Sequence, residues 1–247
     1  MTLQQFFQEN PQTALAFSGG VDSAFLLYAA KEYGVKAHAY YVKTPFQPRF
    51  EYEDAVRLAD ELKMPMTVLE LNTLADTTIA ANPQNRCYYC KQKIFTAIRE
   101  AAARDGFSCL IDGTNASDDA ADRPGMQALV ELQVRSPLRE CGLTKDRIRT
   151  LSKQAGLFTH DKPAYACLAT RIPCGTPITR ELLHQTERSE AFLTALGFSD
   201  FRIRLWENAA RIQIPEAQLP LLLQHREQIL TTLKRDYSAV LLDLEVR

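Results

Sequence analysis

A glycine-containing loop near the N-terminus has the composition of a phosphate-binding turn. It reads Ser18-Gly19-Gly20-Val21-Asp22-Ser23 and lies between an apolar run at 13–17 and a helical pattern from Ala24. Glycine lets the backbone approach a ligand closely, and the N-terminus of a helix attracts phosphate. Ser18 and Ser23 add hydroxyl donors, whereas Asp22 suits an anionic ligand only if Mg²⁺ lies between them. The loop predicts a nucleotide site; a strand-to-helix turn without a ligand is the alternative.

Four cysteines form a second candidate site. Cys87 and Cys90 have Cys-x-x-Cys spacing in a turn predicted to open a helix, which suits a metal ion, a cluster or a redox pair. Cys167 and Cys174 lie in a distant segment that a complete site would need. Three thiolates with an open fourth position fit a [4Fe–4S] cluster whose unique iron binds an added sulfide. A structural Zn²⁺ held by all four thiols, or no metal at all, fits the spacing as well.

The other two cysteines and the N-terminus bear on the cellular compartment. Cys109 lies in an apolar strand pattern and is predicted to be a small core residue, whereas Cys141 has no companion nearby. Six cysteines in 247 residues are too few for a disulfide scaffold. The first ten residues do not resemble a signal peptide, and no apolar run approaches the roughly 20 residues of a membrane span. We expect a cytoplasmic protein without a membrane segment.

The elements that must position these groups alternate between strands and helices in the first half of the chain. Strands are predicted at 13–17, 35–42, 66–71 and 108–112, and helices at 24–33, 51–63 and 90–105. This rhythm indicates an α/β fold with a mainly parallel sheet, helices on both faces and ligands at the carboxyl ends of the strands. A polar loop at 113–126 follows the fourth strand, and a helix is predicted at 144–156 with Thr144 as its N-cap.

The pattern changes near residue 170. The C-terminal part has predicted helices at 179–196 and 216–234 and predicted strands at 201–205, 210–214 and 239–244. We therefore expect a nucleotide-binding domain at 1–170 and a small α+β domain at 171–247. The formal net charge of −1 gives no electrostatic footprint for nucleic acid, so a small-molecule partner is favoured over a polyanion.

Several motifs together resemble one family. They are Ser18–Ser23, Arg86-Cys87-Tyr88-Tyr89-Cys90-Lys91, Asp112-Gly113-Thr114-Asn115, Asp122-Arg123-Pro124-Gly125, Ser136-Pro137-Leu138 and Ala166-Cys167-Leu168-Ala169-Thr170-Arg171-Ile172-Pro173. The first matches the pyrophosphatase loop (PP-loop) of enzymes that cleave ATP between its α and β phosphates. The whole set resembles the LarE-type ATP-dependent sulfur transferases over nearly the entire chain, including its C-terminal part.

The resemblance implies a PP-loop ATP pyrophosphatase fold of the HUP type and a two-step reaction. A carboxylate of pyridinium-3,5-biscarboxylic acid mononucleotide is adenylated, and sulfur from sulfide or another donor then displaces AMP, giving a thiocarboxylate for the nickel-pincer nucleotide. One branch of the family sacrifices its own cysteine, and the other holds a [4Fe–4S] cluster. The Cys-x-x-Cys, and Cys167 four residues before Arg171, resemble the cluster branch, with Cys87, Cys90 and Cys167 as ligands. Cys174 departs from the tyrosine usual there.

The resemblance also implies roles for single residues. Ser18, Gly19, Gly20, Asp22, Ser23 and Gly113 would hold ATP and Mg²⁺; Lys91, Cys167, Arg171 and Glu190 would act in catalysis; and Arg202 and Arg204 would bind the anionic substrate. A solvated lysine and surface ion pairs are the alternatives for the charged positions. Asp119, Asp122 and Arg123 are candidates for ordering the loop that contains them.

Other functions fit parts of the same pattern. A PP-loop enzyme that thiolates a tRNA base, a zinc-stabilised nucleotide-binding module without catalysis, and an amide-forming synthetase share the predicted phosphate site. The balanced charge and the lack of an RNA-binding appendage argue against the tRNA-thiolating enzyme. The lack of a glutaminase-like nucleophile segment argues against the amide-forming synthetase. We expect a nucleotide-like small-molecule substrate and a homo-oligomer formed through the C-terminal domain.

Overall fold

The computed structural model describes residues 1–118 and 123–245, so Asp119, Asp122 and the side chain of Arg123 lie outside the described part. The chain forms two compact units. The first comprises Met1–Thr73 and Asn85–Lys162, and the second comprises Leu74–Gln84 and Pro163–Arg247. None of the helices in the described ranges is long and apolar enough to cross a membrane.

Four parallel strands form the sheet of the first unit. They are β1 (Gln12–Ala16), β2 (Lys36–Lys43), β3 (Met66–Glu70) and β4 (Cys109–Ile111), in the order β3-β2-β1-β4. A helix connects each strand to the next along the chain, which is how parallel neighbours are joined. The predicted α/β fold with a parallel sheet is confirmed.

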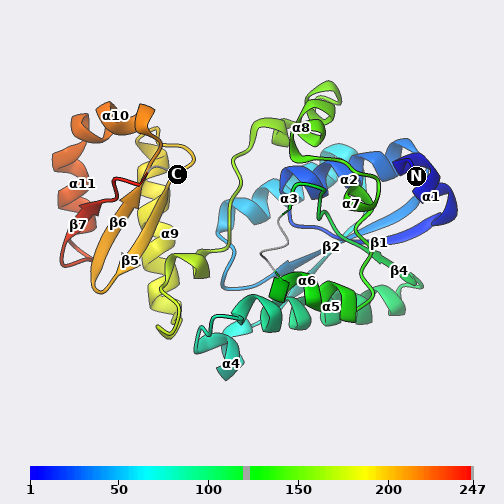
Figure 1. Ribbon diagram of the computed structural model, residues 1–247, viewed down its shortest axis with the longest axis horizontal. Helices are drawn as coiled ribbons and strands as arrows, with labels where there is room; N and C mark the ends of the chain where they lie inside the picture. Colours follow the sequence, from blue (N-terminus) through cyan, green and yellow to red (C-terminus); the bar gives the residue numbers. More distant parts are fainter. Residues whose placement is uncertain (119–122, 246–247) are drawn as a thin grey trace. The chain divides into compact units, whose positions relative to one another are not determined.

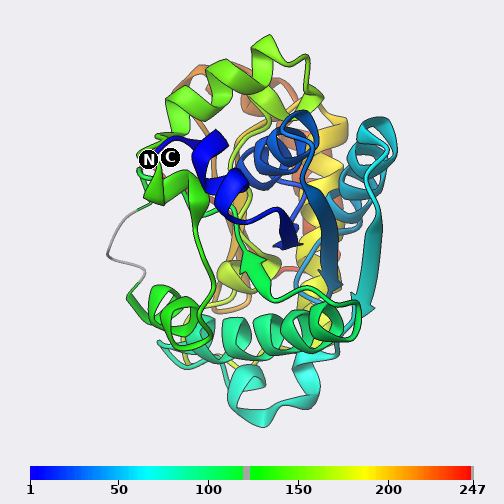
Figure 2. The ribbon, with the colours of Figure 1, turned by 90° about the vertical axis from the view of Figure 1, so that its right-hand side faces the viewer.

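Alternate strand residues face two apolar clusters, one on each side of this sheet. In β1, Leu15 belongs to the cluster formed with the helices at 21–32, 49–62 and 145–154, whereas Ala14 belongs to the cluster formed with the helices at 86–104 and 123–131. The alternation follows from the two-residue period of a strand, and both faces are covered (Figure 1, Figure 2). The helices are α1 (Leu3–Glu9), α2 (Val21–Glu32), α3 (Arg49–Leu62), α5 (Arg86–Arg104), α6 (Arg123–Glu131), α7 (Pro137–Glu140) and α8 (Lys145–Gln154), with the 3₁₀ turn η2 (Phe158–Asp161).

The second unit packs helices against a three-stranded sheet. Its strands are β5 (Arg202–Trp206), β6 (Ala209–Gln213) and β7 (Val240–Leu242), and its helices are α4 (Thr77–Ala80), α9 (Arg180–Ala195), α10 (Leu219–Gln224) and α11 (Arg226–Leu233), with the 3₁₀ turns η1 (Thr73–Ala75), η3 (Leu168–Arg171) and η4 (Glu216–Gln218). β5 and β6 are antiparallel, and β7 is parallel to β6. The helix predicted at 216–234 is divided, because His225 ends α10 and caps α11 with a non-helical backbone.

A short excursion of the chain completes the second unit. The buried Asn82 has a left-handed backbone (φ 56°), and its side-chain amide donates to the carbonyl oxygens of Ile172 (3.3 Å) and Pro173 (2.8 Å). The Asn82 carbonyl in turn accepts from the N–H of Gly175 at 2.8 Å. Leu74–Gln84 therefore belongs with residues after 162, whereas the sequence placed a single boundary near 170.

Candidate functional site

The predicted phosphate loop connects β1 to α2 at the carboxyl edge of the sheet. Gly19 has φ 74°, a conformation that favours glycine, and a Cβ there would lie 3.0 Å from the Cβ of Ala55 on α3. Gly20 is the N-cap of α2, so the loop passes directly into the helix. The first N–H groups of a helix lack carbonyl partners within it. The turn therefore directs backbone donors and the positive end of α2 to one point.

The loop hydroxyls bond to one another and to the loop backbone. The Ser18 and Ser23 oxygens lie 3.0 Å apart, and the Ser23 hydroxyl also lies within hydrogen-bond distance of the Gly20 carbonyl (3.2 Å). The Ser18 backbone N–H donates to the Ser23 hydroxyl at 3.3 Å. The side chains of the loop thus hold the turn in place by hydrogen bonds. Their hydroxyls can exchange these hydrogen bonds for hydrogen bonds to phosphate oxygens.

Gly113 follows β4 and presses against the start of α2. A Cβ at this position would lie 2.8 Å from the Ser23 nitrogen and 3.1 Å from its Cα, both backbone atoms that cannot move aside. The close approach explains why a glycine stands here, since any side chain would push the loop away from the sheet. The sequence assigned Gly113 to the nucleotide, and the structure adds this packing role.

Asp22 makes an ion pair that sequence reasoning missed. The Lys145 Nζ lies 2.5 Å from the Asp22 Oδ2, and the Asn115 amide donates to the other oxygen at 3.4 Å. Burial raises the pKa of the Asp22 carboxyl, although the Lys145 ammonium opposes that shift. Lys145 is the first residue of α8, after the Thr144 N-cap. A cation is unfavourable at a helix N-terminus, so the position itself was a signal of function.

A buried carboxyl network supports the end of β4. The Asp112 oxygens accept from the Thr114 hydroxyl (2.5 Å) and the Ser136 hydroxyl (2.7 Å). Desolvation raises the pKa of the Asp112 carboxyl above its ordinary value, although the hydrogen bonds and the Lys91 ammonium oppose that shift. The catalytic role expected of Lys91, on α5, stays a prediction.

The predicted metal ligands belong to different units. Cys87 and Cys90 lie one turn apart in the first turns of α5, which begins at Arg86, earlier than predicted, while Cys167 caps the 3₁₀ turn η3 in the second unit. In residues 1–118 and 123–245, no three His, Cys, Asp or Glu side chains are gathered so as to hold a metal ion. Because neither unit alone offers the three thiols of the cluster ligand set, that set stays a prediction.

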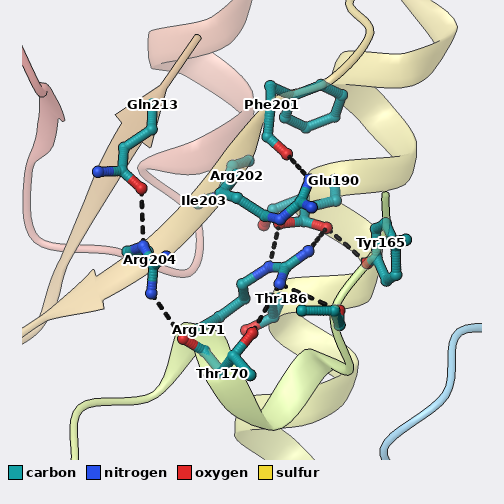
Figure 3. Close-up of polar contacts among 12 residues, drawn as sticks. Tyr165, Thr170, Arg171, Thr186, Glu190, Phe201, Arg202, Ile203, Arg204 and Gln213 are labelled. Atoms are coloured by element: carbon teal, nitrogen blue, oxygen red, sulfur yellow. Dashed lines mark hydrogen bonds and ion pairs between the residues drawn. The ribbon is translucent and has the colours of Figure 1, made fainter. Parts of the chain in front are cut away.

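The second unit brings together the other predicted residues around a buried ion pair. The Arg171 Nε lies 2.8 Å from the Glu190 Oε1, and these side chains are 0% and 5% exposed. Glu190 also accepts from the Tyr165 hydroxyl (2.6 Å) and the Ile203 N–H (3.0 Å). Figure 3 shows this network with Arg204, which donates to Gln213 on β6. Surface ion pairs, the alternative for these charges, do not describe Arg171 and Glu190.

Comparison with known proteins places the chain in a family. No family model matches it. It is 36% identical to an uncharacterized protein of Synechocystis sp. over 98% of this chain and 92% of the relative. It is 30% identical to pyridinium-3,5-bisthiocarboxylic acid mononucleotide synthase of Lactiplantibacillus plantarum over 88% of this chain and 80% of the relative.

A more distant similarity involves only part of the chain. It is 30% identical to a tRNA-specific 2-thiouridylase of Clostridium botulinum over 60% of this chain and 51% of the relative. The longer similarities, together with a phosphate loop at the carboxyl edge of a parallel sheet, assign this protein to the LarE family of PP-loop proteins, the family of pyridinium-3,5-bisthiocarboxylic acid mononucleotide synthase.

Proposed function

We propose that this protein is an AMP-forming, ATP-dependent sulfur transferase that converts a carboxylate of pyridinium-3,5-biscarboxylic acid mononucleotide into a thiocarboxylate for the nickel-pincer nucleotide. The observation that carries the proposal is the phosphate loop with a lysine paired to its aspartate. Lys145 lies 2.5 Å from Asp22, and the Lys91 ammonium also lowers the pKa of the Asp112 carboxyl, which burial raises. A helix N-terminus with a cation beside it suits a triphosphate.

In the first step, the loop and the lysines bind ATP. The backbone N–H groups of α2 and the hydroxyls of Ser18 and Ser23 hold the phosphates. Asp22 would hold the Mg²⁺ that accompanies ATP, and the ion would offset part of the phosphate charge. A substrate carboxylate oxygen attacks the α-phosphorus, and the bond from phosphorus to the bridging oxygen breaks as pyrophosphate leaves. Lys91 and Lys145 offset the negative charge that develops during this displacement. The product is an acyl adenylate.

In the second step, sulfur replaces the activated oxygen. A sulfide ion attacks the acyl carbon, the bond from carbon to the AMP oxygen breaks, and AMP departs with the electron pair. Cys167 takes part in this step in both branches of the family. In one branch it donates its own sulfur, and in the other it is a ligand of the cluster that carries the sulfur. As a donor, its thiolate would form a thioester, and loss of the Cα proton with cleavage of the Cβ–S bond would leave dehydroalanine at position 167.

The cluster is the finer part of the proposal. Cys87 and Cys90 on one turn of α5 would supply two thiolates and Cys167 a third, leaving one iron of a [4Fe–4S] cluster to accept sulfide. Iron and sulfide analysis after anaerobic purification tests it. Bound zinc, or a colourless, iron-free protein whose Cys167→Ala variant stays active, would exclude the cluster.

One experiment tests the reaction itself. Purified protein is incubated with ATP, Mg²⁺, sulfide and the pyridinium dicarboxylate mononucleotide, and the mass of the nucleotide product is measured with AMP and pyrophosphate. We expect one oxygen of a carboxylate to be replaced by sulfur for each AMP released. Absence of AMP with this substrate would refute the proposal. Thiolation of a tRNA base instead would favour the function named for the Clostridium botulinum relative.

The mass of the polypeptide after turnover separates the two sulfur routes. An unchanged polypeptide indicates a sulfur carrier, whereas dehydroalanine at position 167 indicates sacrifice of the cysteine. We also propose that the protein forms a homo-oligomer through its C-terminal domain, and analytical sedimentation tests this. The contacts of Arg171, Glu190, Arg202 and Arg204 support a role in positioning the chain around Cys167, in place of the catalytic and substrate-binding roles that the resemblance implies.

A further inference from the structure

The backbone around Cys167 is held by the side chains of three arginines in the second unit. The Ala166 carbonyl accepts from Arg171 at 3.1 Å, and the Thr170 carbonyl accepts from Arg204 on β5 at 2.8 Å. Arg202, also on β5, donates to the Ala164 carbonyl. Backbone carbonyls before and after Cys167 are therefore bound by guanidinium groups.

Cys167 itself is part of the same arrangement. Its carbonyl accepts from the Thr170 N–H at 2.9 Å and from the Thr170 hydroxyl at 2.8 Å. The Thr170 hydroxyl oxygen accepts from Arg171 at 2.7 Å (Figure 3). The position of the half-buried Cys167 thus depends on Arg171 through both of its neighbours in the segment, Ala166 and Thr170.

Glu190 on α9 anchors these contacts. Its Oε1 accepts from the Arg171 Nε, and its Oε2 accepts from the Arg171 Nη2 at 3.2 Å, which is a two-point contact. The Tyr165 hydroxyl donates to Oε2, and the Tyr165 ring lies 4.7 Å from the Arg171 guanidinium and 5.1 Å from that of Arg202. Tyr165 therefore connects the segment to the ion pair by its hydroxyl and to both arginines by its ring.

These contacts are incompatible with Arg171 as a direct ligand of the substrate. The side chain is fully buried, and its donors already serve Glu190, Ala166 and Thr170. Turning it toward a substrate would leave a buried carboxylate without its cation, which is strongly unfavourable. Arg202 is buried too, and it serves two backbone carbonyls, those of Phe201 and Ala164.

We propose that Tyr165, Arg171, Glu190 and Arg202 are positioning residues that fix the backbone on either side of Cys167, and that the buried Arg171, Glu190 and Arg202 bind no substrate. Arg204 contributes from the far side through Thr170. That this arrangement presents the Cys167 thiol for sulfur transfer rests on the proposed function. That it fixes the backbone around Cys167 does not, so the fixed backbone and the sulfur transfer can be tested separately.

The decisive variant is Tyr165→Phe, which keeps the ring over the guanidiniums and removes the hydroxyl that bonds to Glu190. We expect faster hydrogen exchange in a peptide covering 164–170 and a several-fold change in the rate at which iodoacetamide alkylates Cys167, followed by mass spectrometry at several pH values. The exposed Cys174 reports general reactivity in the same sample, and its rate should not change. No ATP or substrate is present, so this result is independent of the proposed reaction.

Tyr237→Phe is the matched control. Tyr237 is buried in the same unit, in the apolar cluster formed by α9, β5 and β6, and the change removes its hydroxyl. Its loss should leave Cys167 alkylation unchanged. Arg171→Lys is a second test variant, and we expect no rescue by lysine because one ammonium cannot bridge both Glu190 oxygens and the Ala166 carbonyl.

The outcomes separate positioning from the alternatives. In the complete reaction, a positioning role lowers kcat of sulfur transfer in Tyr165→Phe and leaves KM for the nucleotide and ATP–pyrophosphate exchange unchanged. Unaltered alkylation of Cys167, a raised KM with unaltered local exchange, or a uniform rise in exchange across the second unit would each overturn the proposal. If the wild type transfers no sulfur at all, the proposed function fails, while the exchange and alkylation results still decide the positioning role.

Discussion

At the phosphate loop, the polar side chains are satisfied by one another. Ser18 bonds to Ser23, and Asp22 bonds to Lys145 and Asn115. Binding of ATP and Mg²⁺ has to exchange some of these contacts for contacts to phosphate and metal. Each exchange restores a bond where one is broken, so the loop can stay ordered in both states.

Replacing Lys145 should weaken the first chemical step. In Lys145→Gln the cation beside the loop is lost, and removal of a preorganised charge of this kind costs about 100-fold in rate. We expect ATP–pyrophosphate exchange to fall by that order while far-ultraviolet circular dichroism stays unchanged. Lys153→Gln, which changes an exposed lysine on the same helix, is the control. Equal exchange rates in the two variants would contradict the role of Lys145.

Gly113→Ala should displace the loop. The new Cβ would meet the Ser23 backbone at 2.8 Å, and such overpacking costs about 1–3 kcal/mol. We expect a lower free energy of unfolding in urea and weaker ATP binding by calorimetry. Gly20→Ala is the comparison for stability, because its Cβ would meet only the Ser18 hydroxyl at 3.5 Å. Wild-type stability and ATP binding in Gly113→Ala would show that the contact is relaxed elsewhere.

Asp22 predicts a particular dependence of stability on pH. Burial raises its pKa in the native state above the ordinary value of 3.8. At pH values between 3.8 and this raised pKa, the native state therefore binds more protons than the unfolded state. The free energy of unfolding should therefore fall as pH rises through that window, and Asp22→Asn should remove this contribution. The variant also loses the ion pair with Lys145, which shifts its free energy of unfolding as a whole. The quantity to compare is therefore the slope of the free energy of unfolding against pH.

Glu140 gives the opposite sign under the same conditions. A hydrogen bond from Arg135 lowers the pKa of its carboxyl below 4.5, so this group contributes stability above pH 4.5 that is lost as pH falls through the native value. Urea unfolding of wild type, Asp22→Asn and Glu140→Gln at several pH values measures both. Identical slopes in wild type and Asp22→Asn would show that burial does not control the Asp22 titration.

At the scale of elements, Asn82 connects the excursion to the rest of the second unit. Asn82→Gly keeps the left-handed backbone but removes the amide that donates to Ile172 and Pro173, and an unsatisfied buried acceptor costs about 1–3 kcal/mol. We expect faster hydrogen exchange in 172–178 and unchanged ATP binding. Gln133→Gly, at an exposed residue with φ 55°, carries only the cost of adding a glycine. Equal effects of the two changes would contradict the role of the amide.

The elements show what the sequence could and could not predict. The four strands were predictable because residues such as Ala14 and Leu15 are buried on both faces of a parallel sheet, which produces continuous apolar runs. The start of α5 was predicted too late: Asn85 is its N-cap and is of a residue type that favours this position, but it follows a proline-containing turn and makes no capping bond. The excursion at 74–84 was missed because its partners, Ile172 and Pro173, are some 90 residues away.

The candidate site was predictable in part for a similar reason. The phosphate loop is one stretch of six residues, so its chemistry can be predicted from the sequence. Lys145 was missed because its partner Asp22 is 123 residues distant. The resemblance to the family singled out Arg171 and Arg202, but the carbonyls and the carboxylate that they bind could be identified only from the fold.

For the whole molecule, the proposed chemistry is divided between the units. The groups assigned to adenylation lie in the first unit and Cys167 in the second. Cys167→Ser should therefore retain substrate-dependent ATP–pyrophosphate exchange within about twofold, a change of roughly 0.4 kcal/mol, and should lose sulfur transfer. Gly113→Ala should lose both activities. Loss of exchange in a folded Cys167→Ser protein would show that the two steps are not separable in this way.

The excursion at Leu74–Gln84 also has a consequence for how the protein is made. On the ribosome, Asn82 emerges long before Pro173, its hydrogen-bond partner 91 residues later. At about 5–20 residues per second, its amide waits roughly 5–18 s for that carbonyl. The strands β1 to β3 are already synthesised by then, whereas the second unit cannot close until its last segment arrives. In the nascent chain, an unfinished piece of the second unit therefore stands between two sequence segments of the first.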